Sequence, residues 1–455
     1  MGVILMKRIL CGNIYYQLND NYYIMNLISF RRQKLSYNEI LTLNSINKKL
    51  ENYVSFTETE EKLYNYLLDK KQILSKELID KFDQGLMQSV NHNFSVNIES
   101  ISINLTYQCN YNCRYCYQKQ YSDKSGVMTK NLINRIYNFL DFYIGNNCGQ
   151  FKLKTLLISG GETLLEDNIP IINHILNRFG DKVEKFILYT NGTNILKYKK
   201  KIDYSRIKEY QVSLDGIDPV ISKLNRYCKK AFHDIVNGIK LLAELGSKVS
   251  IITMLCQDTV KYLHDLINHL EAQNILSYDN VSMRVSNIMN NFKNSIIDED
   301  FYTLNEYLEL KDIAKKIIGN RNIVVDTLYG LSPLSSRILR ANNARLGYRI
   351  SRCNEINIPL LFGPNGKVYW CNCEDPKLGL IGEFFPEIAL DIQSIKGFQS
   401  RNIFSIDKCK NCELRYICVG GCVLPNVAQK KAIFEPNCGV FENEFCMENL
   451  ERFIF

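Results

Sequence analysis

SINLTYQCNYNCRYCYQ, residues 102–118, runs from a β-type pattern directly into a loop that carries three cysteines. Cys109, Cys113 and Cys116 have the spacing C-x3-C-x2-C, and no fourth cysteine follows nearby. A structural zinc site takes four protein ligands, and an iron–sulfur cube normally takes four thiolates. Three thiolates on one loop therefore predict a metal centre with one open position, where a substrate or cosubstrate binds. A purely structural metal knuckle is the competing interpretation.

The chain from about residue 100 alternates β-type and helical patterns. Helical stretches such as LINRIYNFLDFYI and FHDIVNGIKLLAEL separate most of the β-type runs. Strands that alternate with helices pair in parallel, so the pattern predicts an α/β fold with a partial (β/α)6 TIM-like barrel. Chemistry in such barrels lies at the C-terminal ends of the strands, where the cysteine loop begins. The six runs are SINLTYQC, TLLISGG, KFILYTNG, YQVSLDG, KVSIITMLC and VSMRVSN.

The length of 455 residues predicts two to four domains. Two Tyr/Ile-rich runs around Asn19 predict a β-hairpin, capping boxes that begin at Ser36 and Thr57 predict helix starts, and a third helical stretch follows near Ser75. Strands followed by about three helices are typical of a winged-helix-like domain. The predicted domains are 1–95, the N-terminal domain; 96–290, the barrel; 291–350, a helical bridge; and 351–455, a Cys-rich C-terminal domain.

Composition narrows the classes of function. The net charge of +8 is mild and spread along the chain, which favours a solvated surface over nucleic-acid binding, although a basic groove for an acidic peptide stays open. No apolar run is long enough for a membrane helix, and the first residues do not form a signal peptide. We therefore expect a cytoplasmic protein with reduced thiols, in which most of the 16 cysteines, clustered at short spacings, indicate metal sites. Four scattered cysteines carry no predicted chemistry: Cys11, Cys148, Cys228 and Cys256.

The C-x3-C-x-aromatic-C loop, with Tyr115 in the aromatic position, resembles the signature of the radical S-adenosylmethionine (SAM) enzymes. In that family the three cysteines hold a 4Fe-4S cluster, and SAM chelates the open iron through its amino and carboxylate groups. The reduced cluster gives one electron, the C–S bond of SAM breaks, and a 5′-deoxyadenosyl radical forms. Cofactors of this kind carry the radical chemistry while the protein binds and orients the substrate.

Further segments carry the same resemblance. Gly160, Gly161 and Glu162 match the family's Gly-Gly-Glu motif, which contacts the methionine amino group of SAM. The glycines let a ligand approach the backbone closely, because they have no Cβ. Thr163 stands where the family usually has proline. The resemblance implies three further SAM-binding residues, for the ribose hydroxyls or the carboxylate: Ser213, Asp215 and Arg226.

The last quarter of the chain contains a second cysteine pattern, with the run C-x2-C-x5-C-x3-C over residues 409–422. Together with Gly366-x4-Cys371, this pattern resembles the SPASM domain of some radical SAM enzymes. A zinc ribbon is the alternative for the four-cysteine run alone, but the surrounding thiols are too many for one zinc ion.

The SPASM resemblance implies two auxiliary 4Fe-4S clusters. A fourth ligand of the first cluster is either Cys373 or an open iron position, and Cys446 is an alternative to Cys438 in the second. The implied ligands are Cys353, Cys371 and Cys422 for the first cluster, and Cys409, Cys412, Cys418 and Cys438 for the second.

SPASM enzymes mostly modify peptides, which predicts a maturase acting on a ribosomally made (RiPP) precursor peptide, possibly Cys-rich, with a flavodoxin- or ferredoxin-type electron donor. A thioether or C–C crosslink is the predicted product. The N-terminal domain either captures the leader of the peptide by strand addition or merely packs on the barrel. One alternative is an anaerobic sulfatase-maturating enzyme, against which Asn372 counts because that family commonly has an Asp beside the second SPASM cysteine. The other is a cluster-bearing binding protein without catalysis.

Overall fold

The protein is described by a computed structural model over most of its length. The described residues are 13–18, 21–26, 28, 31–90, 98–113, 116, 118, 126–148, 151–217, 231–287, 304–325, 360–371, 380–384, 387–410, 412, 415, 420 and 434–436.

Over the described residues, a mixed sheet of eleven strands forms the largest part of the fold, in the order β10-β9-β8-β7-β6-β5-β4-β11-β12-β13-β14. Its six predicted strands, β4 to β9, pair in parallel in sequence order, as the alternating pattern predicts. They span Ser100–Asn104 (β4), Leu153–Ser159 (β5), Val183–Thr190 (β6), Glu209–Ser213 (β7), Lys248–Leu255 (β8) and Val281–Asn287 (β9). The α/β class and the partial TIM-like barrel are confirmed.

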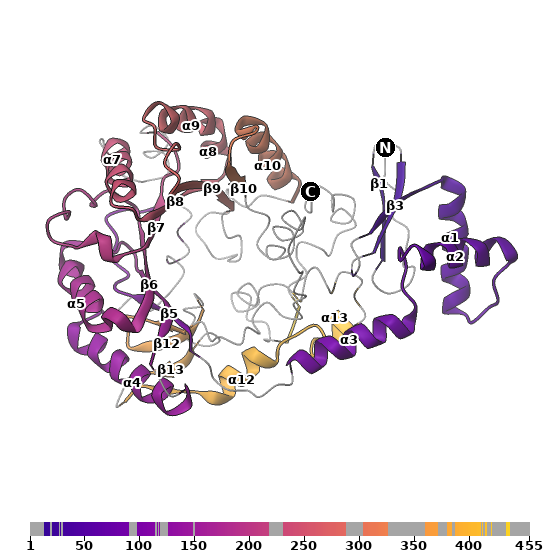
Figure 1. Cartoon of the computed structure of the whole chain (residues 1–455), viewed down its shortest axis with the longest axis horizontal. Coiled ribbons are helices and arrows are strands. Elements are labelled where there is room, and N and C mark those ends of the chain that lie inside the picture. Colours follow the sequence, from indigo (N-terminus) through magenta and orange to yellow (C-terminus); the bar gives the residue numbers. More distant parts are fainter. Residues whose placement is uncertain are drawn as a thin grey trace.

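Helices cover the outer side of this curved sheet (Figure 1). Side chains of the strands alternate, so that residues such as Leu156, Ile158 and Leu188 are buried against the helices, while their neighbours on the inner side keep partial exposure. The covering helices are α4 (Lys130–Cys148), α5 (Ile169–Phe179), α7 (Ala231–Glu244), α8 (Gln257–Lys261), α9 (Leu263–Ala272) and α10 (Leu304–Ile318).

The sheet extends beyond the six predicted strands at both ends. On one side β10 (Ile323–Val325) adds a further parallel strand beside β9, so the predicted bridge over 291–350 is not wholly helical. On the other side β11 (Leu360–Phe362) pairs in parallel with β4. The C-terminal part of the chain is therefore continuous with the barrel sheet. Three antiparallel strands complete this edge: β12 (Lys367–Trp370), β13 (Leu380–Glu383) and β14 (Ala389–Leu390).

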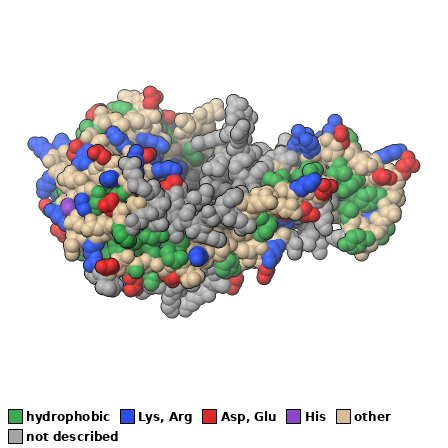
Figure 2. Space-filling model, turned by 60° about the horizontal axis from the view of Figure 1, so that its bottom comes forward, with side chains coloured by type: hydrophobic (Ala, Val, Ile, Leu, Met, Phe, Trp, Pro, Cys, Tyr) green, Lys and Arg blue, Asp and Glu red, His purple; other side chains and the backbone are tan. Residues whose placement is uncertain are grey.

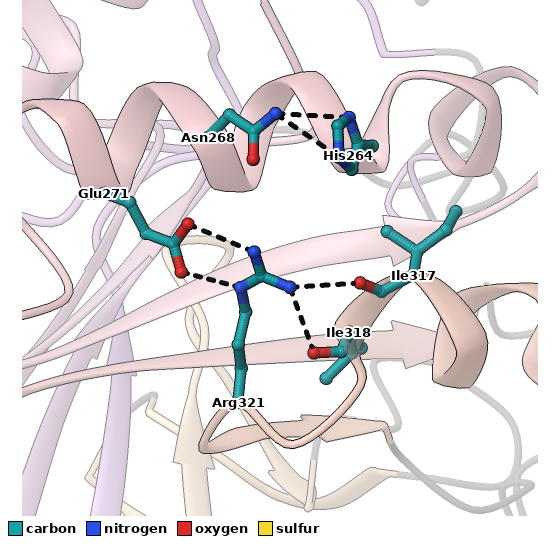
Figure 3. A network of polar contacts seen from close by, with 6 residues as sticks. All are labelled: His264, Asn268, Glu271, Ile317, Ile318 and Arg321. Atoms are coloured by element: carbon teal, nitrogen blue, oxygen red, sulfur yellow. Dashed lines mark hydrogen bonds and ion pairs between the residues drawn. The ribbon is translucent and has the colours of Figure 1, made fainter.

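Arg321 fastens the β10 end of the sheet (Figure 3). Its guanidinium makes a two-point ion pair with Glu271 of α9, at 2.6 and 3.2 Å, and it also donates to the carbonyl oxygens of Ile317 and Ile318. These carbonyls belong to the last turn of α10, where backbone acceptors have no helical partner. One side chain thus caps α10 and ties it to α9.

The N-terminal part has a three-stranded antiparallel sheet, ordered β1-β2-β3, and three helices. The predicted hairpin is confirmed as β1 (Asn13–Leu18) and β2 (Asn21–Asn26), and β3 (Arg32–Leu35) pairs with β2. Both predicted capping boxes are present, at the starts of α1 (Tyr37–Glu51) and α2 (Glu58–Asp69). The third predicted helix is α3 (Lys76–Val90).

Helix α3 connects this N-terminal part to the C-terminal part (Figure 1). Ile79 belongs to an apolar cluster with Ile403, Ile406 and the buried Cys409. The Asp83 carboxylate accepts a 2.8 Å hydrogen bond from the Arg415 guanidinium, and the two side chains are 18% and 5% exposed. The helices on the C-terminal side are α12 (Ile392–Ser400) and α13 (Asp407–Lys410).

The surface is mixed in charge. On the face shown in Figure 2, acidic and basic side chains are interspersed, which agrees with the prediction of a solvated surface. Within the described ranges, no helix has the length and apolar character needed to cross a membrane.

We predict that Asp83→Asn weakens the contact between α3 and the C-terminal part. The substitution leaves the Arg415 guanidinium, 5% exposed, without its carboxylate partner, which costs about 3 kcal/mol of unfolding free energy. The matched control is Glu77→Gln on the same helix, because Glu77 pairs with Lys81 at the surface and such pairs contribute below about 1 kcal/mol. Urea unfolding measures both, and equal losses would contradict the prediction.

Candidate functional site

The cysteine loop leaves the barrel at the C-terminal end of β4, as predicted. The Cys109 side chain is exposed, and those of Cys113 and Cys116 are partly exposed. A turn closes within the loop, because the backbone N–H of Cys116 donates to the carbonyl oxygen of Cys113 at 3.2 Å. All three thiols therefore stand on one short segment beside the ends of the parallel strands.

The electrostatics of Cys109 show that these groups influence one another. Desolvation by the surrounding protein raises the pKa of its thiol to about 12, although the side chain reaches the surface. A hydrogen bond from the Tyr111 backbone N–H opposes this rise, while the negative charges of Glu162, Cys113 and Cys116 add to it. Without a metal ion this thiol is protonated at neutral pH, so metal binding would release its proton.

The donor set suits an iron–sulfur cluster in kind and in number. Cysteine thiolates are the ligands such clusters take, and three of them leave one iron free for another ligand. Over the residues that the structure describes, no three His, Cys, Asp or Glu side chains are already gathered closely enough to hold a metal ion.

The turn that follows β5 packs directly against the start of the cysteine loop. The backbone N–H of Gly161 donates to Thr106 O at 2.7 Å, and that of Glu162 donates to Gln108 O at 2.9 Å. A Cβ on Gly161 would lie 2.2 Å from Gln108 O, and one on Gly160 would lie 3.0 Å from Thr106 O. The glycines leave room for residues 106–108 of the neighbouring backbone, and not for a ligand as their lack of a Cβ had suggested.

Glu162 is buried, at 1% exposure, and its carboxylate accepts hydrogen bonds from three protein groups. Oε1 accepts from the Leu164 N–H at 2.8 Å and from the Thr190 hydroxyl at 2.6 Å. Oε2 accepts from the Asn191 N–H at 2.7 Å. The carboxylate thus joins the turn after β5 to the loop after β6, and SAM contact by the Gly-Gly-Glu turn stays a prediction.

Ser213 and Asp215 lie at and just after the end of β7, as predicted. Asp215 is fully buried, and its Oδ1 accepts from the Met254 N–H of β8 at 2.8 Å. Ser213 is partly exposed on the inner side of the sheet. The contact of both residues with SAM stays a prediction, and burial favours Ser213 over Asp215 as the residue that meets a ligand.

Of the predicted auxiliary-cluster ligands, Cys371, Cys409 and Cys412 are described. Cys371 follows β12 and is exposed, whereas Cys409 is buried and Cys412 is partly buried. The Cys412 N–H donates to Cys409 O at 3.0 Å, so these two thiols share one tight turn. The other predicted site residues lie outside the described residues: Tyr115, Arg226, Cys353, Cys373, Cys418, Cys422 and Cys438.

Sequence reasoning assigned no role to the inner side of β6. Burial raises the pKa of Tyr189, and the charges of Glu209, Arg284 and Cys371 act on the same phenol. Tyr189 alternates with the buried Leu188 and Thr190, which places it on the inner side of the sheet. Cys371 thus lies within electrostatic reach of the inner side. The run KFILYTNG predicts a strand with alternating side chains, but the sequence alone does not show which side of the sheet Tyr189 occupies. The parallel pairing of β6 with its neighbours shows this.

Residues 103–270 match the Radical SAM superfamily. The chain contains a radical SAM domain. This domain holds the cysteine loop, the Gly-Gly-Glu turn and the strands that position them. The superfamily's enzymes use a 4Fe-4S cluster and SAM, which agrees with the thiols of the loop.

Two of the curated relatives are similar to this chain over different lengths. A probable GTP 3′,8-cyclase of Methanococcus aeolicus is 30% identical over 182 residues, which cover 39% of this chain and 58% of that protein. The radical SAM cyclopropyl synthase TigE of Paramaledivibacter caminithermalis is 24% identical over 349 residues, 72% of this chain and 68% of that protein. Both relatives are named as enzymes, and the match spans less than two thirds of the cyclase.

Two solved proteins have a similar fold. SuiB of Streptococcus suis, bound to S-adenosylmethionine, aligns with a TM-score of 0.54 at 16% identity and covers 96% of this chain and 100% of that chain. SuiB has also been solved with its precursor peptide SuiA, where 95% of this chain aligns. The protein anSMEcpe with bound AdoMet gives a TM-score of 0.51 at 16% identity and covers 79% of this chain and 98% of that chain. Likeness at this identity shows the fold.

We predict that Gly161→Ala displaces the cysteine loop, because the new methyl group would meet Gln108 O at 2.2 Å and neither backbone can yield cheaply. We expect about 2 to 3 kcal/mol of destabilisation and iron binding reduced well below that of the unchanged protein. The matched control is Gly145→Ala in α4, where nothing lies within 4 Å and alanine stabilises a helix by up to about 1 kcal/mol. Thermal unfolding and iron analysis after anaerobic reconstitution test both, and wild-type values for Gly161→Ala would contradict the prediction.

Proposed function

We propose that this protein is a radical SAM/SPASM maturase that reductively cleaves SAM and uses the 5′-deoxyadenosyl radical to crosslink a ribosomally made precursor peptide. The observation that carries the proposal is the cysteine loop packed against the Gly-Gly-Glu turn at the ends of β4 and β5. This arrangement supports a cluster that binds SAM at its open iron. When bound, the cluster supplies the electron that cleaves the C–S bond of SAM.

In this proposal the described residues bind the cluster and orient SAM. Cys109, Cys113 and Cys116 hold the cluster, and the turn at Gly160–Glu162 faces it. Because Glu162 is buried among protein donors, we assign its carboxylate to holding the turn and assign the amino group of SAM to the turn as a whole. Ser213, on the inner side, is the better placed of the two β7 residues for the nucleotide.

The C-terminal cysteines are assigned to auxiliary 4Fe-4S clusters in a SPASM domain. Cys409 and Cys412 share one tight turn, which supports a metal centre held by this part of the chain. A thioether crosslink removes one hydrogen atom from a peptide carbon and a proton from a cysteine thiol while the S–C bond forms. The remaining electron needs an acceptor, and an auxiliary cluster provides one by chemical class.

A peptide substrate is supported by the extent of the shared fold. The alignment with SuiB, which has been solved with a precursor peptide, covers 95% of this chain, whereas that with anSMEcpe covers 79%. SuiB therefore matches a larger share of this chain than anSMEcpe does. Among the described strands of the N-terminal sheet β2 lies in the centre, so β1 and β3 are the ones that offer an edge for a leader strand. Tyr23 packs against the main apolar cluster, which supports a structural role for this part as well.

The proposal predicts that Cys113→Ala abolishes 5′-deoxyadenosine formation and lowers iron by about four atoms per chain, because one missing thiolate leaves the loop cluster without a full ligand set. The matched control is Cys256→Ser. Cys256 is buried and caps α8 through its sulfur, and serine can keep that cap. Anaerobic protein, dithionite, SAM and chromatography give the product, and unchanged SAM cleavage in Cys113→Ala would refute the loop as the catalytic centre.

A second prediction separates the two peptide chemistries. Incubation with SAM and a Cys-containing peptide encoded beside the gene is expected to remove two hydrogens from the peptide without creating an aldehyde, since a crosslink joins two existing groups. Mass spectrometry with and without an aldehyde-trapping hydrazide makes the measurement. A trapped aldehyde would instead support the sulfatase-maturating chemistry.

A further inference from the structure

The YTNGT segment, residues 189–193, at the end of β6 carries a function that the motifs above leave open. Residues 190–193 of this segment lie between Glu162 and the cysteine loop. Thr190 donates its hydroxyl to Glu162 and accepts from the Gly192 N–H at 3.0 Å. Gly192 has a φ of +83° and abuts Val212, so a side chain there would be strained and crowded. The loop therefore has a fixed shape.

Three side chains form a closed ring of hydrogen bonds across the two loops. Asn191 Nδ2 donates to Asn110 Oδ1 at 2.8 Å. Asn110 Nδ2 in turn donates to Thr193 Oγ1 at 3.1 Å. The Thr193 hydroxyl completes the ring by donating to Asn191 Oδ1 at 2.7 Å. Each member is both donor and acceptor, an arrangement in which the bonds strengthen one another.

The direction of this ring is fixed by the backbone. The Thr193 N–H, which can only donate, also bonds to Asn191 Oδ1 at 3.2 Å. Asn191 must therefore present its oxygen to Thr193 and its amino group to Asn110. Asn110 must then accept with its oxygen and donate with its nitrogen. Only one arrangement of the two amides satisfies every group.

Cys109 is held from both sides as a result. On one side, the Gln108 carbonyl accepts from the Glu162 N–H. On the other side, Asn110 is held by the ring. The two supports are themselves joined, because the Glu162 carboxylate accepts from the Asn191 N–H at 2.7 Å. The backbone flanking Cys109 is thus fixed relative to the Gly-Gly-Glu turn.

We propose that Asn110, Asn191 and Thr193 are positioning residues. They hold Cys109, and with it the open iron of the cluster, at the correct distance from the Gly-Gly-Glu turn. The inference rests on the proposed function, since it concerns the cluster held by the loop. None of the three residues needs to touch SAM. Their effect is to strengthen SAM binding at the open iron, because the loop is already ordered before SAM binds.

The experiment follows SAM binding through the electron paramagnetic resonance signal of anaerobic, dithionite-reduced protein. A cluster with an open iron responds to SAM, and the Cys113→Ala protein, which is expected to lack the loop cluster, gives the background signal of the auxiliary clusters. Thr193→Val removes the hydroxyl without changing the size of the side chain, and Asn110→Ala removes the amide. Because each change removes two of the ring's hydrogen bonds, we expect the SAM concentration at half-effect to rise about tenfold.

Two controls separate the ring from general damage. Thr193→Ser keeps the hydroxyl and is expected to stay within about twofold of the unchanged protein, since the ring survives. Asn173→Ala removes a remote exposed amide that makes one 2.8 Å bond to Lys201 O, and it is expected to have no effect. Iron content and thermal unfolding are measured for every variant.

The outcomes are distinguishable. A wild-type SAM titration in Thr193→Val and Asn110→Ala would overturn the proposal, and so would equal losses in Thr193→Ser and Thr193→Val. If Asn110→Ala fails to fold, the comparison of the two Thr193 variants decides, because they differ by one hydroxyl against one methyl group. If the unchanged protein itself gives no SAM-responsive signal, the proposed function fails and the ring has no such role.

Discussion

The close contact between the Gly-Gly-Glu turn and the start of the cysteine loop is the constraint on which the rest of the site depends. Two backbone hydrogen bonds join residues 160–162 to residues 106–108, and a single Cβ on Gly161 would prevent them. The contact exists because β4 and β5 are adjacent parallel strands, whose C-terminal ends meet at one edge. Pairing of the strands thus brings the motifs together before any cofactor is present.

A second layer of contacts gives this edge its rigidity. The buried Glu162 carboxylate accepts from the last residue of β6 and from the loop that follows, and that loop reaches back to Asn110. Burial of a carboxylate is costly unless hydrogen bonds replace its water, and three described bonds do so here. Three neighbouring strands therefore share one polar network at their ends. The thiols keep their exposure on top of it, where a ligand can reach them.

The sequence predicted the elements whose signals are local. Strand alternation and the capping boxes at Ser36 and Thr57 depend on neighbouring residues, and all were confirmed. The pairing of β11 with β4 was not predicted, because it joins segments far apart in the chain. The same reason applies to Gly160 and Gly161. The sequence shows that they have no Cβ, but the fold is needed to show that the backbone of residues 106–108 occupies the space beside them. Asn110 carried no signal, since its partners belong to another loop.

The continuity of the sheet also bears on how the chain could handle a peptide. The C-terminal strands extend the barrel sheet through β11, and stacking of Trp370 on Phe398, with ring centroids 5.0 Å apart, fastens α12 beneath β12. Helix α3 in turn packs the N-terminal part onto the same C-terminal region through the cluster that contains Cys409. A substrate held by the N-terminal sheet would therefore be tethered to the part that carries the second set of cysteines. The barrel and that part share a single sheet, so under the proposed function such a tether would hold a peptide relative to both sets of thiols.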